Sequence, residues 1–214
     1  MKTILYEQVS RIGKAISSPK RLELLELLVQ GEKTVEKLAD LAHIDVKLAS
    51  AHLKALREAR LVGTRRDGKY VHYRLSNNDV ADLLVRVREV AEVHLIELRD
   101  ALGQMSATPN LLSSETRESL LARARAGDVI VIDVRPGDEY AAAHLPFARS
   151  MPLAELQQRI EELPPGKPVV AYCRGPYCVM SDAAVELLRN KGFSAYKIND
   201  GVGEWRATGL PLEY

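Results

Sequence analysis

Cysteine is scarce in this 214-residue sequence, which contains only Cys173 and Cys178. So few thiols exclude a small secreted scaffold held together by disulfides, and they favour a protein with reduced thiols in the cytoplasm. Long apolar runs are also lacking. None approaches the roughly 18 residues that a membrane-spanning helix needs, and the N-terminus lacks the apolar stretch of a signal peptide. We therefore expect a cytoplasmic protein that does not enter a membrane.

The sequence has no large excess of charge of either sign. A net charge of +1 gives no reason to expect binding to nucleic acid or to a membrane surface. The charges are unevenly placed, however. Residues 1–75 hold 15 Lys and Arg against 9 Asp and Glu, whereas residues 76–214 hold 15 against 20. The small total is therefore a cancellation between a basic part of net charge +6 and an acidic part of −5.

The residue pattern changes near residue 103. Helical periodicity dominates before this point, and short β-branched runs alternate with helical ones after it. Residues 103–110 (GQMSATPN) are small and polar and include a proline, which is typical of a linker. We therefore predict two domains, a mainly α domain over 1–102 and an α/β domain over 111–214.

Residues 17–59 predict three helices with clear ends. Pro19 opens the first helix and Gly31 ends it, while Thr34 and Asp45 cap the second and third. Two short helices joined by a tight connection form a helix-turn-helix, whose second helix fits the major groove of DNA.

A hairpin follows these helices. Asp67-Gly68 lies between two alternating runs, 61–66 and 69–75, and this pattern is a strong signal for a short β hairpin. Arg65, Arg66 and Lys69 lie near its tip, where a wing would meet DNA phosphates. The first domain is therefore predicted to be a winged helix-turn-helix.

One long helix is predicted next, over residues 78–102. Apolar residues recur along it at steps of three and four, from Val80 to Leu102. A single small domain has too little surface to bury this stripe, so we expect the helix to pair with a second copy. Such a homodimer would also match the two-fold symmetry of DNA operators.

Residues 10–100 resemble the ArsR/SmtB family of winged-helix repressors, most clearly in Ser50–Val62 (SAHLKALREARLV) and the Gly68-Lys69 wing. The resemblance implies a homodimer that binds double-stranded operator DNA and leaves it when an inducer is sensed. It also implies which residues meet the groove or the DNA backbone. Together with the wing residues, these are Lys47, Ser50, His52, Lys54, Arg57, Arg65, Arg66 and Lys69.

The metal sites of that family are mostly missing here. The segment that matches its paired-cysteine motif, residues 32–38, has no thiol. Of a second family site, on the long helix, only His94 and Glu97 are present, and Ala81 and Leu83 occupy the other ligand positions. His94 and Glu97 could still give two ligands per chain at a dimer interface. Because His94 lies on the apolar stripe, we expect a core histidine and predict no metal or other cofactor.

The second domain contains three β-branched runs typical of strands buried on both faces, at 128–134, 168–172 and 195–198. Helical stretches between them predict a parallel sheet, which binds ligands at the carboxyl ends of its strands. Cys173 stands at such an end, in a loop that leads to a helix beginning near Val179. Inward-pointing backbone N–H groups and the helix dipole would stabilise a thiolate or a persulfide there.

Residues 113–214 closely resemble a rhodanese domain. The matching pieces are Ile132–Arg135, Glu139-Tyr140 with His144, Cys173–Cys178 and Asp200–Trp205. The resemblance implies a catalytic persulfide on Cys173, held in a cradle made by Arg174, Gly175, Pro176, Tyr177 and Cys178. We expect structural roles for Asp133, Arg135 and His144, with a role in substrate binding left open for Arg135.

The sixth loop position departs from the rhodanese pattern. Many active rhodaneses carry a basic residue there, which completes the cradle for an oxyanion such as thiosulfate, and this chain has Cys178. Thiosulfate sulfurtransfer is therefore expected to be weak. A second thiol can instead attack the Cys173 persulfide and form a disulfide or a sulfur-bridged link. The alternative for Cys178 is a small buried apolar residue.

These features predict a transcriptional regulator, most simply a repressor, that responds to small sulfur species such as persulfide, polysulfide or thiosulfate through Cys173 and Cys178. Two alternatives stay open. One is a sulfurtransferase with an accessory DNA-binding domain, and the other is an As(III) sensor that uses the two thiols.

Overall fold

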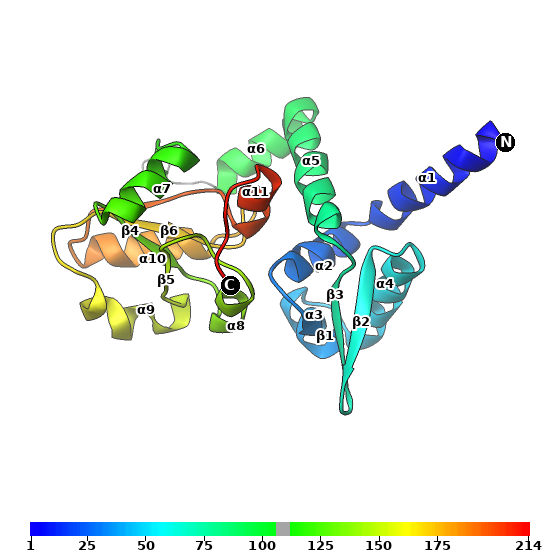
Figure 1. Cartoon of the computed structure of the whole chain (residues 1–214), viewed down its shortest axis with the longest axis horizontal. Coiled ribbons are helices and arrows are strands. Elements are labelled where there is room, and N and C mark those ends of the chain that lie inside the picture. Colours follow the sequence, from blue (N-terminus) through cyan, green and yellow to red (C-terminus); the bar gives the residue numbers. More distant parts are fainter. Residues whose placement is uncertain (106–111) are drawn as a thin grey trace. The chain divides into compact units, whose positions relative to one another are not determined.

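The computed structural model describes residues 1–105 and 112–214 (Figure 1). Their contacts divide the chain into two compact units, Met1–Arg86 and Val87–Tyr214. The division falls inside helix α5 (Asn78–His94), so this helix begins in one unit and ends in the other. Of the predicted linker, residues 103–105 are helical, and residues 106–110 lie outside the described part of the chain.

The Met1–Arg86 unit combines helices with a small antiparallel sheet. Its sheet has the strand order β1-β3-β2. In chain order, the elements before α5 are α1 (Lys2–Ile16), α2 (Pro19–Val29), β1 (Lys33–Thr34), α3 (Val35–Leu41), α4 (Val46–Glu58), β2 (Val62–Asp67) and β3 (Tyr70–Leu75).

The three predicted helices of the helix-turn-helix region are confirmed as α2, α3 and α4, and the predicted caps have a direct structural basis. The Thr34 hydroxyl accepts a hydrogen bond from the Lys37 amide at 3.3 Å, and the Asp45 carboxylate accepts one from the Leu48 amide at 2.8 Å. Each cap satisfies an amide of the first helical turn, which has no partner within its own helix.

The core of this unit is formed by leucines from α2, α3 and α4. Leu24, Leu38, Leu53 and Leu56 are completely buried in it. Helix α1 and strand β1 were not predicted. Four apolar side chains of α1 are exposed, so its own residues lack the buried stripe of a core helix; they are Ile4, Leu5, Tyr6 and Val9.

The predicted hairpin is confirmed as β2 and β3, which pair from Val62 with Leu75 to Asp67 with Tyr70. The two turn residues are Gly68 and Lys69, one position later than the predicted Asp67-Gly68, because Asp67 still pairs with Tyr70. Gly68 adopts the left-handed φ of +58° that such a turn favours. Because both strands extend to this turn, the hairpin carries Arg65 and Arg66 close to its tip.

The prediction of one continuous helix over 78–102 is wrong. Helix α5 ends at His94, and α6 (Ile96–Met105) begins after a one-residue break at Leu95. Apolar periodicity did not reveal the break because a single residue outside the helix leaves the three- and four-residue spacing unchanged. Along the stripe, Val80 and Leu84 are buried, Val87 and Leu98 are half-buried, and Leu95 is exposed. Val90, Val93 and Ile96 lie off the stripe and are also exposed.

The Val87–Tyr214 unit is built around a four-stranded parallel sheet with the order β5-β4-β6-β7. This confirms the predicted α/β class. After α6, its elements are α7 (Arg117–Ala126), β4 (Ile130–Asp133), α8 (Gly137–Ala142), β5 (Arg149–Ser150), α9 (Leu153–Arg159), the 3-10 helix η2 (Ile160–Glu162), β6 (Val169–Tyr172), α10 (Met180–Asn190), β7 (Ala195–Lys197) and α11 (Val202–Ala207).

Both faces of this sheet are buried, as the β-branched runs predict. Val169, Ala171 and Cys173 pack into one core with residues of α9 and α10. Val170 and Tyr172 point to the opposite core, which contains Trp205 of α11. The alternation of β6 therefore places Cys173 on the α10 side, directly after the end of the strand. No helix in the described residues is long and apolar enough to cross a membrane.

Candidate functional site: a two-cysteine loop and a basic helix and wing

The residues predicted to meet DNA lie on α4 and on the hairpin. Lys47, Lys54 and Arg57 of α4 are exposed, whereas Ser50 and His52 are half-buried. Helical spacing places Lys47, Ser50, Lys54 and Arg57 along one side of α4. This helix and the wing therefore present basic side chains to solvent.

The wing cations differ in their surroundings. Arg65 Nε lies 3.0 Å from Glu32 Oε2, and Arg65 Nη1 lies 3.3 Å from Asp67 Oδ2. Hydrogen bonds to these two carboxylates raise the pKa of Arg65. Arg66 is exposed, and Lys69 Nζ lies 5.2 Å from the centre of the Tyr70 ring. Because Arg65 already has two acidic partners, Arg66 and Lys69 are the more accessible wing cations.

The two cysteines lie in a tight loop between β6 and α10. Cys173 is only 2% exposed, and Cys178 is half-buried. The Cys178 amide donates a hydrogen bond to the Gly175 carbonyl at 3.1 Å, which turns the loop back on itself. Gly175 has a φ of +137°, a conformation that favours glycine. The loop thus places the chain's two cysteines beside each other.

The hydrogen bonds around the two sulfurs are unequal. The Cys173 thiol donates to the Cys178 carbonyl at 3.3 Å and lies 3.4 Å from the Ser181 hydroxyl. The neighbouring Cys178 sulfur and burial raise the pKa of Cys173. The adjacent Cys173 thiol and hydrogen bonds from the Arg174 and Met180 amides lower the pKa of Cys178, against the opposing effect of burial.

These surroundings favour Cys178 as the thiolate and Cys173 as the thiol. The amides of Arg174 and Met180 lower the pKa of Cys178, whereas the hydroxyl and amide of Ser181 lower that of Cys173 against the larger effects of the Cys178 sulfur and of burial. The reason is depth, since Cys173 lies in the core under α10, where an unpaired charge is costly.

Two acidic residues from other elements hold the loop in place. Glu139 of α8 is 1% exposed and binds Arg174 through both carboxylate oxygens, at 2.9 Å to Nε and 2.8 Å to Nη2. Glu204 of α11 accepts a hydrogen bond from the Gly201 amide at 2.7 Å. Gly201 in turn packs against the backbone of Arg174, where an added Cβ would lie 2.7 Å from the carbonyl.

Sequence reasoning assigned no site role to Glu139, Ser181, Gly201 or Glu204. Glu139 and residues 200–205 belong to the stretches that resemble rhodanese, so a signal was present. The contacts of Glu139, Gly201 and Glu204 with the loop depend on which helices pack against it, and the local sequence pattern does not show that packing. Ser181 had no signal beyond its place at the start of the helix that follows the loop.

Asp133 and Arg135 form a buried polar network at the carboxyl end of strand β4. Both side chains are completely buried, and Arg135 Nη2 lies 2.5 Å from Asp133 Oδ2 and 2.8 Å from the Ala143 carbonyl oxygen. The Tyr172 hydroxyl donates to the same carboxylate at 2.6 Å. His144 is buried and stacks on Tyr140, with ring centres 3.8 Å apart. This geometry favours the expected structural roles of Asp133, Arg135 and His144.

His94 is exposed, and so is Glu97, so His94 is not the core histidine that its place on the stripe predicts. Within the described residues, no group of three or more ligating side chains could hold a metal ion.

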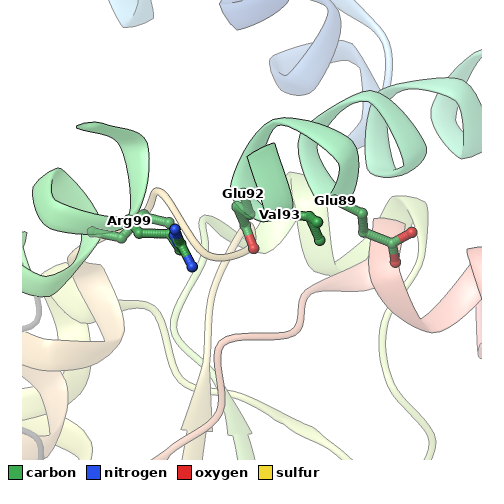
Figure 2. A pocket seen from close by; sticks show the side chains of 5 residues that line it. Glu89, Glu92, Val93 and Arg99 are labelled. Carbon is green, nitrogen blue, oxygen red and sulfur yellow. The ribbon is translucent and has the colours of Figure 1, made fainter. Parts of the chain in front are cut away.

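An open pocket of about 540 Å³ lies where α5 and α6 meet (Figure 2), lined by Glu89, Glu92, Val93, Arg99 and Leu102. These five residues include no thiol, hydroxyl or imidazole, and we assign the pocket no chemistry.

The unequal sulfurs predict an order of reaction with iodoacetamide. We expect Cys178 to be alkylated before Cys173 at pH 7. A lowered pKa keeps the thiolate present at lower pH, so the rate for Cys178 should reach half its plateau well below about pH 8.5, the value for a free cysteine. Trypsin cleaves after Arg174 and places the two cysteines in separate peptides, so mass spectrometry can follow each rate. Faster alkylation of Cys173 would contradict the assignment.

Comparison with known proteins connects both units to described families. A model for "Bacterial regulatory protein, arsR family" matches residues 18–64, and one for "Rhodanese-like domain" matches residues 116–208. The HTH-type transcriptional regulator Rv0324 of Mycobacterium tuberculosis is 42% identical over 212 residues, which cover 99% of this chain and 93% of that protein. A probable mercury resistance operon repressor of Streptomyces lividans is 34% identical over 85 residues, 40% of this chain and 68% of that protein.

Among solved structures, the homodimeric winged helix-turn-helix DNA-binding domain (fragment 1–100) of Mb0332 from Mycobacterium bovis is 43% identical. The match covers 45% of this chain and 89% of that one, with a TM-score of 0.42. The full-length relative decides the family. This chain belongs to the ArsR family of HTH-type transcriptional regulators, and a rhodanese-like domain follows its helix-turn-helix domain.

Proposed function

We propose that this regulator is a repressor that senses small sulfur species through Cys173 and Cys178. One observation carries the proposal: the two cysteines of the chain lie in one loop, where one sulfur is favoured as a thiolate and the other lies beside it as a thiol. A thiolate is the form that attacks sulfane sulfur. In a transcriptional regulator, such a reactive pair is better suited to sensing than to structural support.

The proposed chemistry has two balanced steps. The Cys178 thiolate attacks the sulfane sulfur of a persulfide RSSH, the S–S bond breaks, and RS⁻ leaves as Cys178 becomes a persulfide. Cys173 then loses its proton to the leaving HS⁻ as its sulfur attacks the inner sulfur of the Cys178 persulfide, so a Cys173–Cys178 disulfide forms and H₂S is released. With a longer polysulfide, attack by Cys173 on the middle sulfur of a Cys178–S–S–SH chain gives a sulfur-bridged link and H₂S.

The proposed DNA contacts are made by α4 and by the wing. Lys47, Lys54 and Arg57 are exposed on α4, and Arg66 and Lys69 are exposed on the hairpin, so these cations can reach phosphates or base edges. Half-buried Ser50 and His52 and the acid-paired Arg65 are the weaker members of the proposed set.

The proposed partner in assembly is a second copy of the chain. Exposed apolar side chains lie at the end of α5 and the start of α6, where Val90, Val93, Leu95 and Ile96 are 52–67% exposed. Helix α1 exposes another such group. Burial of these side chains in a homodimer would remove apolar surface from water.

Operator affinity measured in two sulfur states tests the function. A duplex selected from a random library by the reduced protein serves as operator. Treatment with polysulfide is expected to weaken its binding by about 5- to 150-fold, which corresponds to a coupling of about 1–3 kcal/mol. Cys173→Ser and Cys178→Ser should bind the duplex when reduced and lose this response. Unchanged affinity of the wild-type protein, with the cysteines modified according to mass spectrometry, would rule the proposal out.

Two controls sharpen this experiment. Lys69→Ala should weaken binding in both states and leave their ratio unchanged, because it removes a proposed phosphate contact only. Turnover with thiosulfate or 3-mercaptopyruvate that survives Cys178→Ser, together with an unresponsive operator complex, would favour the sulfurtransferase alternative. Release of DNA by As(III) but not by polysulfide would favour the arsenic sensor.

A further inference from the structure

Arg88 of α5 is in direct contact with the cysteine loop and with its support. Its guanidinium forms an ion pair with Glu204 of α11, and both side chains are only 9% exposed. The same guanidinium lies 5.4 Å from the centre of the Tyr177 ring, within cation–π range. All three residues belong to the Val87–Tyr214 unit. A cation on α5 is therefore held between the loop and the helix that supports it.

Glu204 connects this cation to the backbone of the loop. One carboxylate oxygen pairs with Arg88, and the other accepts the Gly201 amide at 2.7 Å. The Glu204 carboxylate also packs against Gly175, because a Cβ built on Gly175 would lie 3.1 Å from Glu204 Oε2. Any change of the backbone at Gly175 or Gly201 must therefore move Glu204 or break its contacts.

Tyr177 connects the cation to the reactive sulfur. It directly precedes Cys178 in the chain and is 40% exposed, so its ring can move when its neighbour moves. Formation of a Cys173–Cys178 bond draws Cys178 toward the core in which Cys173 is buried and removes the thiolate charge. The movement reaches Arg88 through the Tyr177 ring, whose centre lies 5.4 Å from the guanidinium.

We propose that Arg88 is the coupling residue that transmits the sulfur state of the loop to helix α5. This inference rests on the proposed function and names the means of its regulation. Helix α5 begins in the other unit, where Val80 and Leu84 are part of the core that also contains the helix-turn-helix. A helix transmits displacement along its axis because its backbone hydrogen bonds keep it stiff, so α5 can carry a change at Arg88 to that core.

Hydrogen–deuterium exchange of the full chain without DNA tests the coupling itself. In the wild-type protein, polysulfide treatment should change the rate of backbone amide exchange in peptides from residues 85–94. We expect a change of at least about 5-fold, which is the lower end of typical allosteric coupling. Arg88→Met should lose this change although its cysteines are modified to the same extent. Equal exchange in the two sulfur states of the wild-type protein would overturn the inference.

Two further variants separate coupling from folding. Arg88→Met leaves Glu204 buried without this partner, so the double variant Arg88→Met/Glu204→Gln removes both charges together. Arg86→Met makes the same substitution at an exposed position of the same helix and should keep the wild-type response. If the double variant keeps the exchange response of the wild-type protein, the assignment of Arg88 is wrong.

Operator binding of the same variants separates this inference from the proposed function. If the wild-type protein shows the exchange response but no change in DNA affinity, sulfur sensing at the operator fails and the coupling stands. If the wild-type DNA affinity responds and Arg88→Met responds equally, sensing stands and the coupling through Arg88 fails. The inference gains support if reduced Arg88→Met binds DNA like the reduced wild type and polysulfide weakens its binding by less than about 2-fold. The same treatment should weaken wild-type binding by about 5-fold or more.

Discussion

Asp133→Ala is expected to destabilise the Val87–Tyr214 unit by about 3–5 kcal/mol, because it leaves the buried charge of Arg135 without its carboxylate. Arg135 is completely buried, and the Tyr172 hydroxyl loses its acceptor in the same variant. The single tryptophan of the chain, Trp205, is buried in this unit. Urea unfolding followed by its fluorescence therefore reports on this unit directly.

Two matched variants show whether burial causes this loss. Tyr172→Phe removes the hydrogen bond to the same carboxylate and leaves the buried Leu145 amide without the hydroxyl that accepts from it, so it should cost about 1–3 kcal/mol. Arg159→Ala removes ion pairs to Glu155 and Glu162 at the surface and should leave the urea midpoint nearly unchanged. If Asp133→Ala shifts the midpoint no more than Arg159→Ala does, the network has no structural importance.

Gly201→Ala is expected to displace the cysteine loop. Its Cβ would lie 2.7 Å from the carbonyl carbon and oxygen of Arg174 and 2.8 Å from the Cys173 oxygen, and these backbone atoms cannot turn away as a side chain could. Overpacking of this kind costs about 1–3 kcal/mol. Since the Arg174 amide helps to keep Cys178 as a thiolate, its displacement should raise the pKa of Cys178.

Alkylation of Cys178 at about pH 5, below its pKa of about 6, measures this effect. There the thiolate is the minor form, so a pKa increase of about one unit should lower the rate in Gly201→Ala by about 10-fold. Gly137→Ala is the control, because a Cβ at Gly137, the first residue of α8, has no neighbour within 4 Å. A wild-type alkylation rate in Gly201→Ala would show that Gly201 does not position the loop.

Much of the fold follows from local pattern. Thr34 and Asp45 cap helices as their side chains predict, and Gly68 makes the hairpin turn. The β-branched runs form strands buried on both faces, and the alternation within β6 separates Cys173 from Tyr172. These features depend on neighbours within a few residues, and such neighbours are visible in the sequence.

Other features depend on residues far apart in the chain. The break at Leu95 leaves the apolar spacing intact, and the exposure of the apolar side chains around it depends on packing. Strand β1 has two residues and exists only because β3 pairs with it. Local periodicity in the sequence therefore predicts neither the break in the helix nor the short strand.

The same distinction holds for the candidate site. The sequence by itself determined that two cysteines share one loop after a strand, that the first 75 residues are basic, and that both halves resemble known families. Only the tertiary structure decided which sulfur is favoured as the thiolate, because this depends on depth in the core and on the amides of Arg174 and Met180. It also brought Arg88 to Glu204, 116 positions away, since helices α5 and α11 meet only after folding.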